Sequence, residues 1–417
     1  IMEEYLNRRK KLLEKLPDNS IAISFSGNEI RQSADEGFKF TPDYSFFYLT
    51  GIKQASTILL MTKNSIMSDE YLFIQKFDAL KEVWTGIRLK AQEAREIASL
   101  ENVLFLEHFE KVLEKCIEEL SINGNVNVYL DFETAVNLGD FDTFVSIADY
   151  KKQLEKYKTI TVCDMSEILK RMRMVKSDYE ISELRKAITN TNKGLKAVLN
   201  ELEPNKYEYE MANLFKYTIS KDNNAVLSFN TIAASGSNAI ILHYPNPMGM
   251  MHNGDLLLLD LGSDHNFYKA DISRTYPING KYNDLQKKIY ETVLECNELI
   301  IDYIKPGLTI ADLQKKTREF FFDRLKEMGL VEKEEDLMKY YYHNISHHLG
   351  LDTHDISLRE LPLEKGNVIT VEPGLYIKEY GIGVRIEDDV LVTEDGSECL
   401  SKEIVKSVKD IENLMKR

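Results

Sequence analysis

The chain has 417 residues, of which 43% are hydrophobic and 29% are charged, and this length is sufficient for two domains with separate cores. Its formal net charge of −15 argues against nucleic acid or an anionic membrane as a main partner. No run approaches the roughly 20 apolar residues of a membrane span, and residues 1–16 lack the apolar segment of a secretory signal. Four widely spaced cysteines without a Cys-x-x-Cys pair indicate reduced thiols, so we expect a cytoplasmic protein.

The first 165 residues predict a compact α/β domain. A helix is expected over residues 3–16, and charged segments predict further helices within 90–120. Short runs rich in β-branched and aromatic residues predict strands at 21–25, 46–50, 56–61, 70–75, 126–131 and 159–163.

A domain boundary is expected near residues 165–176. Just beyond it, Ser177 is followed three residues later by Glu180, which is the spacing of a helix capping box. We therefore predict one domain over residues 1–165 and a second over 166–417.

The second domain contains an internal repeat. Residues 188–215 and 290–317 share the order helix, proline, short turn and second helix. Such helix pairs are common and carry little weight alone. Each copy, however, continues to a glycine, an apolar strand and, six residues after the glycine, a carboxylate, which is Asp260 in one copy and Glu372 in the other. Two units packed with approximate two-fold symmetry would bring both carboxylates to one centre.

A histidine precedes each of these carboxylates by nearly the same interval, His243 before Asp260 and His354 before Glu372. The repeat therefore carries a histidine and an acid to matching places.

Each copy also supplies a second acid on the returning strand. Asp260 interrupts an apolar strand, which is costly unless a partner compensates its charge. The chain then turns and returns with Asp271, so a hairpin would place the two carboxylates side by side, where a cation is the natural compensation. Glu372 and Glu387 repeat this arrangement. Four of the eight histidines fall within twelve residues nearby, and these are His343, His347, His348 and His354.

Taken singly, an acid in a strand is more often structural than a metal ligand, and a histidine cluster can be a polar loop. Asp388 and Asp389 are expected to be solvated turn acids beside Glu387. Within a duplicated scaffold the metal interpretation is favoured. Four carboxylates and one imidazole form a hard, oxygen-rich set that suits Mn²⁺ better than structural zinc. This much negative charge exceeds the need of one divalent ion, so we predict two ions.

The residues at this point resemble a known family. LLLDLG, ADISRT, SHHLGLDTHD, TVEPGLY and GVRIEDD resemble the pita-bread metallopeptidases, in the branch of aminopeptidase P and prolidase. YLNRRKKLLEKLP and WTGIRL resemble the N-terminal domain of aminopeptidase P, which methionine aminopeptidases lack, and creatinase lacks the ligand set. The implied fold is α+β, with an α/β N-terminal domain followed by a pseudo-two-fold pita-bread catalytic domain. Departures occur at Asn344, where relatives usually have glycine, and at His348, where some have tryptophan.

The resemblance implies a role for each ligand. Asp260 and Asp271 would hold one metal ion, His347 and Glu372 the other, and Asp271 and Glu387 would bridge them. A hydroxide between the ions would attack the scissile carbonyl carbon.

Further roles follow from the same resemblance. Glu372 would also carry the proton to the leaving nitrogen. His354 would stabilise the tetrahedral intermediate, and His243 would lie on the leaving-group side. His343 and Arg385 would line the proline pocket, although a structural histidine at position 343 is an equal alternative.

The implied activity is that of an Xaa-Pro aminopeptidase, which removes the N-terminal residue from peptides with proline second. A prolidase restricted to Xaa-Pro dipeptides is the nearest alternative. A non-catalytic peptide-binding module is a third, although such modules generally lose ligands and none is lost here.

Trp84, the only tryptophan, lies in a segment that resembles the WxGxR stretch of bacterial aminopeptidase P. The resemblance predicts a homo-oligomer, dimer or tetramer, in which Trp84 lies on an exposed loop at a subunit contact and borders a neighbour's substrate entrance. A position in the core of its own domain is the competing interpretation.

Overall fold

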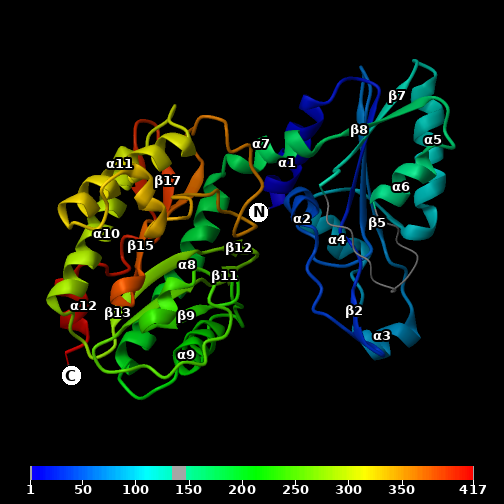
Figure 1. Ribbon diagram of the computed structural model, residues 1–417. Helices are drawn as coiled ribbons and strands as arrows, with labels where there is room; N and C mark the ends of the chain where they lie inside the picture. The colour runs from blue at the N-terminus through cyan, green and yellow to red at the C-terminus, as the bar shows by residue number, and fades with distance from the viewer. Residues whose placement is uncertain (1, 134–146, 417) are drawn as a thin grey trace. The chain divides into compact units, whose positions relative to one another are not determined.

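The computed structural model describes residues 2–133 and 147–416. The chain divides into two compact units, Ile1–Met172 and Arg173–Arg417 (Figure 1). The division falls within helix α7 (Ser166–Met174), and the exact boundary between residues 165 and 166 stays a prediction. Over the described ranges, no helix combines the length and the apolar character that crossing a membrane requires.

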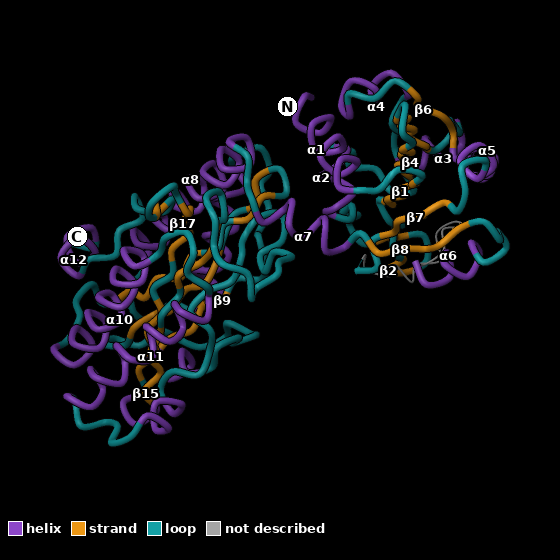
Figure 2. Tube along the Cα trace, turned by 90° about the horizontal axis from the view of Figure 1, so that it is seen from above, coloured by secondary structure: helices purple, strands orange, loops and turns teal. Residues whose placement is uncertain are grey.

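The first unit is built on a six-stranded mixed sheet with the strand order β6-β5-β4-β1-β7-β8. Strand β1 pairs antiparallel with β4 and parallel with β7. Apolar side chains of β1, β4, β5 and β7 pack against α5 and α6, which cover one face of the sheet (Figure 2). The strands are β1 (Ser20–Phe25), β4 (Ile58–Lys63), β5 (Ser68–Ile74), β6 (Asn102–Phe105), β7 (Val126–Leu130) and β8 (Ile160–Asp164).

The helices of this unit are α1 (Met2–Lys15), α2 (Tyr44–Thr50), α3 (Ala79–Thr85), α4 (Ala91–Ala98), α5 (Phe109–Ser121) and α6 (Ile147–Leu154). A short turn η1 (Leu106–His108) precedes α5, and β2 (Arg31–Ser33) pairs with β3 (Glu36–Gly37).

One strand prediction in this unit is wrong. Residues 46–50 lie in helix α2, because the Asp43 side chain accepts a hydrogen bond from the Phe46 N–H and caps the helix N-terminus. Gly51, with φ of 72°, ends the helix in the left-handed conformation. A short helix buried on all sides has the same continuous apolar run as a buried strand, so periodicity did not separate them. The other predicted strands and the helix at 3–16 are confirmed.

The second unit contains the two predicted helical pairs. The first is α8 (Asp178–Glu201) with α9 (Glu208–Ser220), and the second is α10 (Asp284–Tyr303) with α11 (Ile310–Glu327). Ser177 and Glu180 form the predicted capping box at the start of α8. Figure 1 shows the first pair in green and the second in yellow. Helix α9 packs on β9, and α10 packs on β14, β15 and β16.

The strands of the second unit follow the same duplication. One three-stranded sheet has the order β13-β10-β9 and another has the order β14-β17-β18, while β15 pairs with β16. A bridge between Ser273 and Glu387 connects the two copies. The strands are β9 (Ile232–Ser235), β10 (Leu256–Leu261), β11 (Asp264–His265), β12 (Tyr268–Lys269), β13 (Ile272–Pro277), β14 (Val368–Val371), β15 (Gly374–Ile377), β16 (Ile382–Arg385), β17 (Asp388–Val392) and β18 (Ser397–Cys399).

Four short elements complete this unit. They are η2 (Gly236–Ile240), η3 (Glu334–Lys339), η4 (Lys378–Tyr380) and the terminal helix α12 (Val408–Leu414).

Candidate metal centre

The acidic side chains lie where paired strands of the two copies end. Asp260 belongs to β10 and is opposite Ser273 of β13, and Asp271 directly precedes β13. In the second copy Val371 of β14 is opposite Asp388 of β17, so the next pair along this register is Glu372 with Glu387. The strand pairing therefore carries the acids of each copy toward a common centre.

Distances within the site suit a cation. One ligand atom each from Asp271, His347 and Glu387 lie within 4.8 Å of one another. His347 Nε2 is 3.3 Å from Asp271 Oδ2 and 3.4 Å from Glu372 Oε1. The other ring nitrogen of His347, Nδ1, is 2.9 Å from the carbonyl oxygen of His348. If Nδ1 carries the proton and donates it to this oxygen, Nε2 has a lone pair available to bind a metal ion.

Asp260 shares this environment and has an unused oxygen. Its Oδ2 accepts a hydrogen bond of 2.9 Å from Arg385, whereas its buried Oδ1 has no hydrogen-bond partner among the residues that the structure describes. A buried acceptor without a partner is costly, and a metal ion would satisfy it.

The raised pKa values of the clustered carboxyl groups also indicate a cation site. Burial, together with the charge of Asp260, raises the pKa of the Asp271 carboxyl well above its usual range. Burial raises the pKa of Glu372 to about 7, and burial with the neighbouring Asp271 raises the pKa of Glu387 strongly. Crowded buried carboxylates resist ionisation unless a cation joins them. The residues therefore fit a hard divalent metal.

A hydrogen-bonded chain lies beside the acids. His343 Nε2 is 2.8 Å from the Tyr376 hydroxyl, and Arg385 donates to the same hydroxyl at 2.9 Å. Arg385 also donates to the Ser273 hydroxyl, which in turn donates to Glu387 Oε2 at 2.7 Å. Burial, followed by the positive charge of Arg385, lowers the pKa of His343 to about 4, so its imidazole is neutral near pH 7.

His354 and His243 are the more exposed histidines of the site. The His354 ring centroid is 4.3 Å from that of His347, at an interplanar angle of 83°. Burial lowers the pKa of His354, and the charges of His347 and His243 lower it further, which places His243 in the same electrostatic environment.

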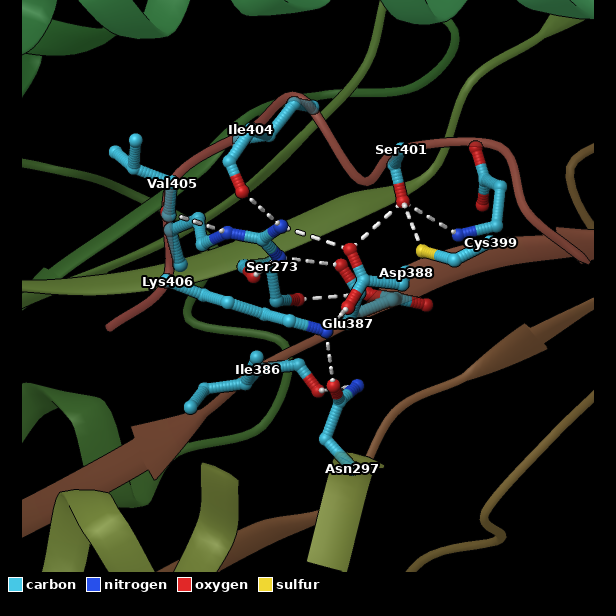
Figure 3. A network of polar contacts seen from close by, with 12 residues as sticks. Ser273, Asn297, Ile386, Glu387, Asp388, Cys399, Ser401, Ile404, Val405 and Lys406 are labelled. Atoms are coloured by element: carbon cyan, nitrogen blue, oxygen red, sulfur yellow. Dashed lines mark hydrogen bonds and ion pairs between the residues drawn. The ribbon is translucent and has the colours of Figure 1, made fainter. Parts of the chain in front are cut away.

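The prediction that Asp388 and Asp389 are solvated turn acids is wrong, because both are 0% exposed. Asp388 accepts hydrogen bonds from Arg274, Ser401 and Lys406 at 2.7, 2.7 and 2.9 Å (Figure 3). Two cations hold the pKa of Asp388 well below its usual range despite burial.

Arg274 and Asp389 extend this support to the ligands. Arg274 also donates to the backbone carbonyl of Glu387 at 2.7 Å, and Asp389 Oδ2 accepts from the Asp271 N–H at 3.1 Å. Asp388, through Arg274, and Asp389, directly, therefore fix the backbone of the ligands rather than facing water.

A second buried ionic group holds the chain around His354. Asp355 accepts from Arg173 at 2.6 Å and from Lys176 at 2.8 Å, and its N–H donates to the His348 carbonyl. The two cations lower the pKa of Asp355 to about 2 although burial opposes them. His348, the departure from the family pattern, is itself buried, and burial followed by the charge of Lys176 lowers its pKa to about 3.

Trp84 belongs to the first unit, and its side chain is 82% exposed, so the core interpretation is wrong. It lies in the short helix α3 rather than in a loop, since Asp78 caps that helix by accepting from the Leu80 and Lys81 N–H groups. Neighbouring apolar side chains are also highly exposed: Phe77, Leu80, Val83 and Ile87.

Sequence reasoning missed Tyr376, Ser273 and the supporting acids Asp388 and Asp389. Tyr376 lies at the end of the quoted TVEPGLY motif and Ser273 lies within ADISRT, so both could have been found by asking which polar side chains flank the ligands. No local pattern distinguishes Asp388 from a surface acid, since its partner Arg274 is 114 residues away.

Comparison with known proteins places this arrangement in a family. The model of metallopeptidase family M24 matches residues 182–394, and that of the aminopeptidase P N-terminal domain matches residues 5–124. The chain therefore belongs to metallopeptidase family M24. The α/β N-terminal domain and the pita-bread catalytic domain expected from the sequence are confirmed.

Within this family, the chain is similar to proteins named Xaa-Pro aminopeptidase or aminopeptidase P. An Xaa-Pro aminopeptidase of Haemophilus influenzae is 32% identical over 99% of this chain and 97% of its own length. A solved structure from Bacillus anthracis, described as a candidate aminopeptidase P, has a TM-score of 0.93 and 39% identity over 99% of this chain and 98% of its own. Zinc-substituted Escherichia coli aminopeptidase P in complex with product has a TM-score of 0.90 and 30% identity, covering 100% and 98% of the two chains.

Proposed function

We propose that the protein is a metal-dependent Xaa-Pro aminopeptidase, which hydrolyses the bond between an N-terminal residue and a following proline. The observation that carries the proposal is the largely buried cluster of Asp271, His347, Glu372 and Glu387, in a chain whose full-length relatives bear this name.

We propose two divalent ions per chain, with Mn²⁺ as the native metal. The support is the donor set, which is one imidazole and four carboxylates, together with the unsatisfied Oδ1 of Asp260. Asp260 and Asp271 would hold one ion and His347 and Glu372 the other, with Asp271 and Glu387 shared. When bound, the ions supply Lewis acidity and lower the pKa of water.

The protein's own groups would manage the protons and the developing charge. Glu372 would accept a proton from the attacking water and deliver it to the leaving nitrogen. His354 would donate a hydrogen bond to the carbonyl oxygen as it gains charge, and His243 would contact the leaving-group side.

His343 and Arg385 would shape the proline subsite. The neutral His343 and the Tyr376 hydroxyl would form one wall of this subsite. Arg385 holds the hydroxyl in place by donating a hydrogen bond to it. A proline nitrogen in a peptide has no N–H to recognise, so selection depends on the shape of the ring. Arg385 also donates a hydrogen bond to Asp260, so the same side chain contacts both the proposed proline subsite and a proposed metal ligand.

A prolidase is the alternative with the same chemistry, and the aminopeptidase P N-terminal domain favours the aminopeptidase. Liquid chromatography with mass spectrometry would compare a tripeptide with proline second, the same tripeptide with alanine second, and the Xaa-Pro dipeptide. We expect release of the first residue from the proline tripeptide at the highest kcat/KM. Cleavage of the dipeptide alone would establish the prolidase, and no cleavage of any peptide would favour a peptide-binding module.

We also propose that α3 contacts a second copy of the chain and that Trp84 borders the neighbour's substrate entrance. The support is the exposed apolar side chains on this short helix and directly beside it, since such patches mark interaction surfaces. The four unpaired cysteines favour the cytoplasm as the compartment.

A further inference from the structure

The segment that carries His243 has little regular structure of its own. After β9 it forms the short turn η2 and then continues without helix or strand to residue 249. His243 itself is exposed. A side chain on such a segment keeps a defined position only if the segment is attached elsewhere.

The attachment is the carboxylate of Glu208, the first residue of α9, which is 0% exposed. Its Oε1 accepts from the Ser235 N–H and hydroxyl, both at 2.7 Å, and from Asn238 Nδ2 at 2.9 Å. Its Oε2 accepts from the Gly249 N–H at 2.8 Å. One side chain therefore binds the segment near its beginning, at residues 235 and 238, and at its end, at residue 249.

The end of the segment is fitted closely to this carboxylate. The Glu208 N–H donates to the Gly249 carbonyl at 2.9 Å, so residue 249 is bound through both its backbone groups. A Cβ atom at position 249 would lie 2.8 Å from Glu208 Oε1 and from Asn238 Nδ2. Only glycine leaves room for these contacts.

The bound segment in turn contacts the site. Asn238 Nδ2 also donates to the Tyr244 hydroxyl at 3.2 Å, and the Tyr342 hydroxyl donates to the Ile240 carbonyl at 2.7 Å. Leu242 and Tyr244, the neighbours of His243 in the chain, pack in the same apolar cluster as Tyr376. The backbone on both sides of His243 is therefore held against the wall of the proposed proline subsite.

We propose that Glu208 is a positioning residue for catalysis, which acts by fixing the 235–249 segment and through it His243. This inference rests on the role proposed for His243. Within the described residues, the side-chain hydrogen bonds of Glu208 go to Ser235, Asn238 and Gly249 and not to the ligand cluster, so we expect its effect to depend on that histidine.

Glu208→Gln tests the proposal because it removes one acceptor while keeping size. An amide has one oxygen and one NH₂ group. With the oxygen facing Ser235 and Asn238, the NH₂ group faces the Gly249 N–H, and two donors oppose each other. The matched control is Glu210→Gln. Glu210 is exposed and lies in the same helical turn, and its side chain accepts from the Tyr207 N–H at 2.7 Å rather than from residues 235–249.

Steady-state kinetics on the metal-loaded protein with a proline tripeptide provide the first readout. We expect Glu208→Gln to lower kcat/KM about tenfold and Glu210→Gln to leave it unchanged, with equal metal content in both. In a His243→Ala background we expect Glu208→Gln to have little further effect, since both changes remove one function. An unchanged kcat/KM for Glu208→Gln, or a full additional tenfold loss in that background, would overturn the proposal.

Limited proteolysis separates this inference from the proposed function, because it requires no activity. A protease that cleaves after large apolar residues should cut Glu208→Gln at Leu242 or Met248 at least several times faster than the wild-type protein or Glu210→Gln. Faster cutting at these positions, in a protein that cleaves no tripeptide, would support the anchor while refuting the aminopeptidase. Equal cutting of all three proteins would refute the anchor.

Discussion

Metal binding is expected to release protons, because burial and mutual repulsion raise the pKa values of three acidic ligands, Asp271, Glu372 and Glu387, in the metal-free protein. Burial raises the pKa of Glu372 to about 7, and burial together with neighbouring acids raises the pKa values of Asp271 and Glu387 well above their usual range. Carboxylates bind metal in their ionised form, so each protonated ligand must lose its proton when the ion enters.

Glu372 gives the size of the effect. Its pKa rises from 4.5 to about 7, and at about 1.4 kcal/mol per pKa unit the ionised form costs about 3 kcal/mol in the metal-free fold. A raised pKa stabilises the fold fully below pH 4.5, and this contribution is lost as the pH rises through about 7. Metal-free protein should therefore lose stability over this window. Apparent metal affinity should rise about tenfold per pH unit for each proton displaced.

Calorimetric titration with Mn²⁺ at pH 6.5, in two buffers of different ionisation enthalpy, counts the protons. We expect at least about one proton per chain, and fewer for Glu372→Gln, since glutamine carries no acidic proton. Glu360→Gln is the control, because Glu360 is exposed. Zero protons released, with the same affinity from pH 5.5 to 7.5, would refute the electrostatic reasoning.

Four substitutions test the proposed roles. Glu372→Gln should reduce kcat about 100-fold or more while the circular dichroism spectrum stays unchanged, and near-normal turnover would show that the role is wrongly assigned. His354→Ala and His243→Ala should each lower kcat about 100-fold with two ions retained by metal analysis. If either variant lost half of its metal, that histidine would be a ligand. Trp84→Ala should shift the protein toward smaller species in analytical ultracentrifugation, and identical sedimentation of variant and wild type would exclude a contact at this residue.

The sequence predicted the parts of the site that depend on local patterns. Asp260 and Glu372 stand out because each interrupts an apolar strand, and the two helical pairs follow from proline and capping residues such as Ser177. Strand register then carries each acid to the position expected from the repeat.

The remaining features depend on contacts between distant residues. Asp388 has the composition of a surface turn and is buried only because Arg274 and Lys406 neutralise it. Glu208 looks like an ordinary first-turn acid of a helix, and its four donors come from 27 to 41 residues along the chain. The helix at residues 44–50 was missed because complete burial removes the periodicity on which the distinction depends.

The central claim is that two divalent ions in the cluster of Asp260, Asp271, His347, Glu372 and Glu387 make this protein an Xaa-Pro aminopeptidase. The most direct test is to remove metal with a chelator, return Mn²⁺ in measured steps, and follow release of the first residue from a proline tripeptide. We predict no turnover without metal and a rise in activity that saturates at about two ions per chain, with Mn²⁺ the most effective ion. Full activity of the metal-free protein, or metal-restored cleavage at another bond only, would contradict the account.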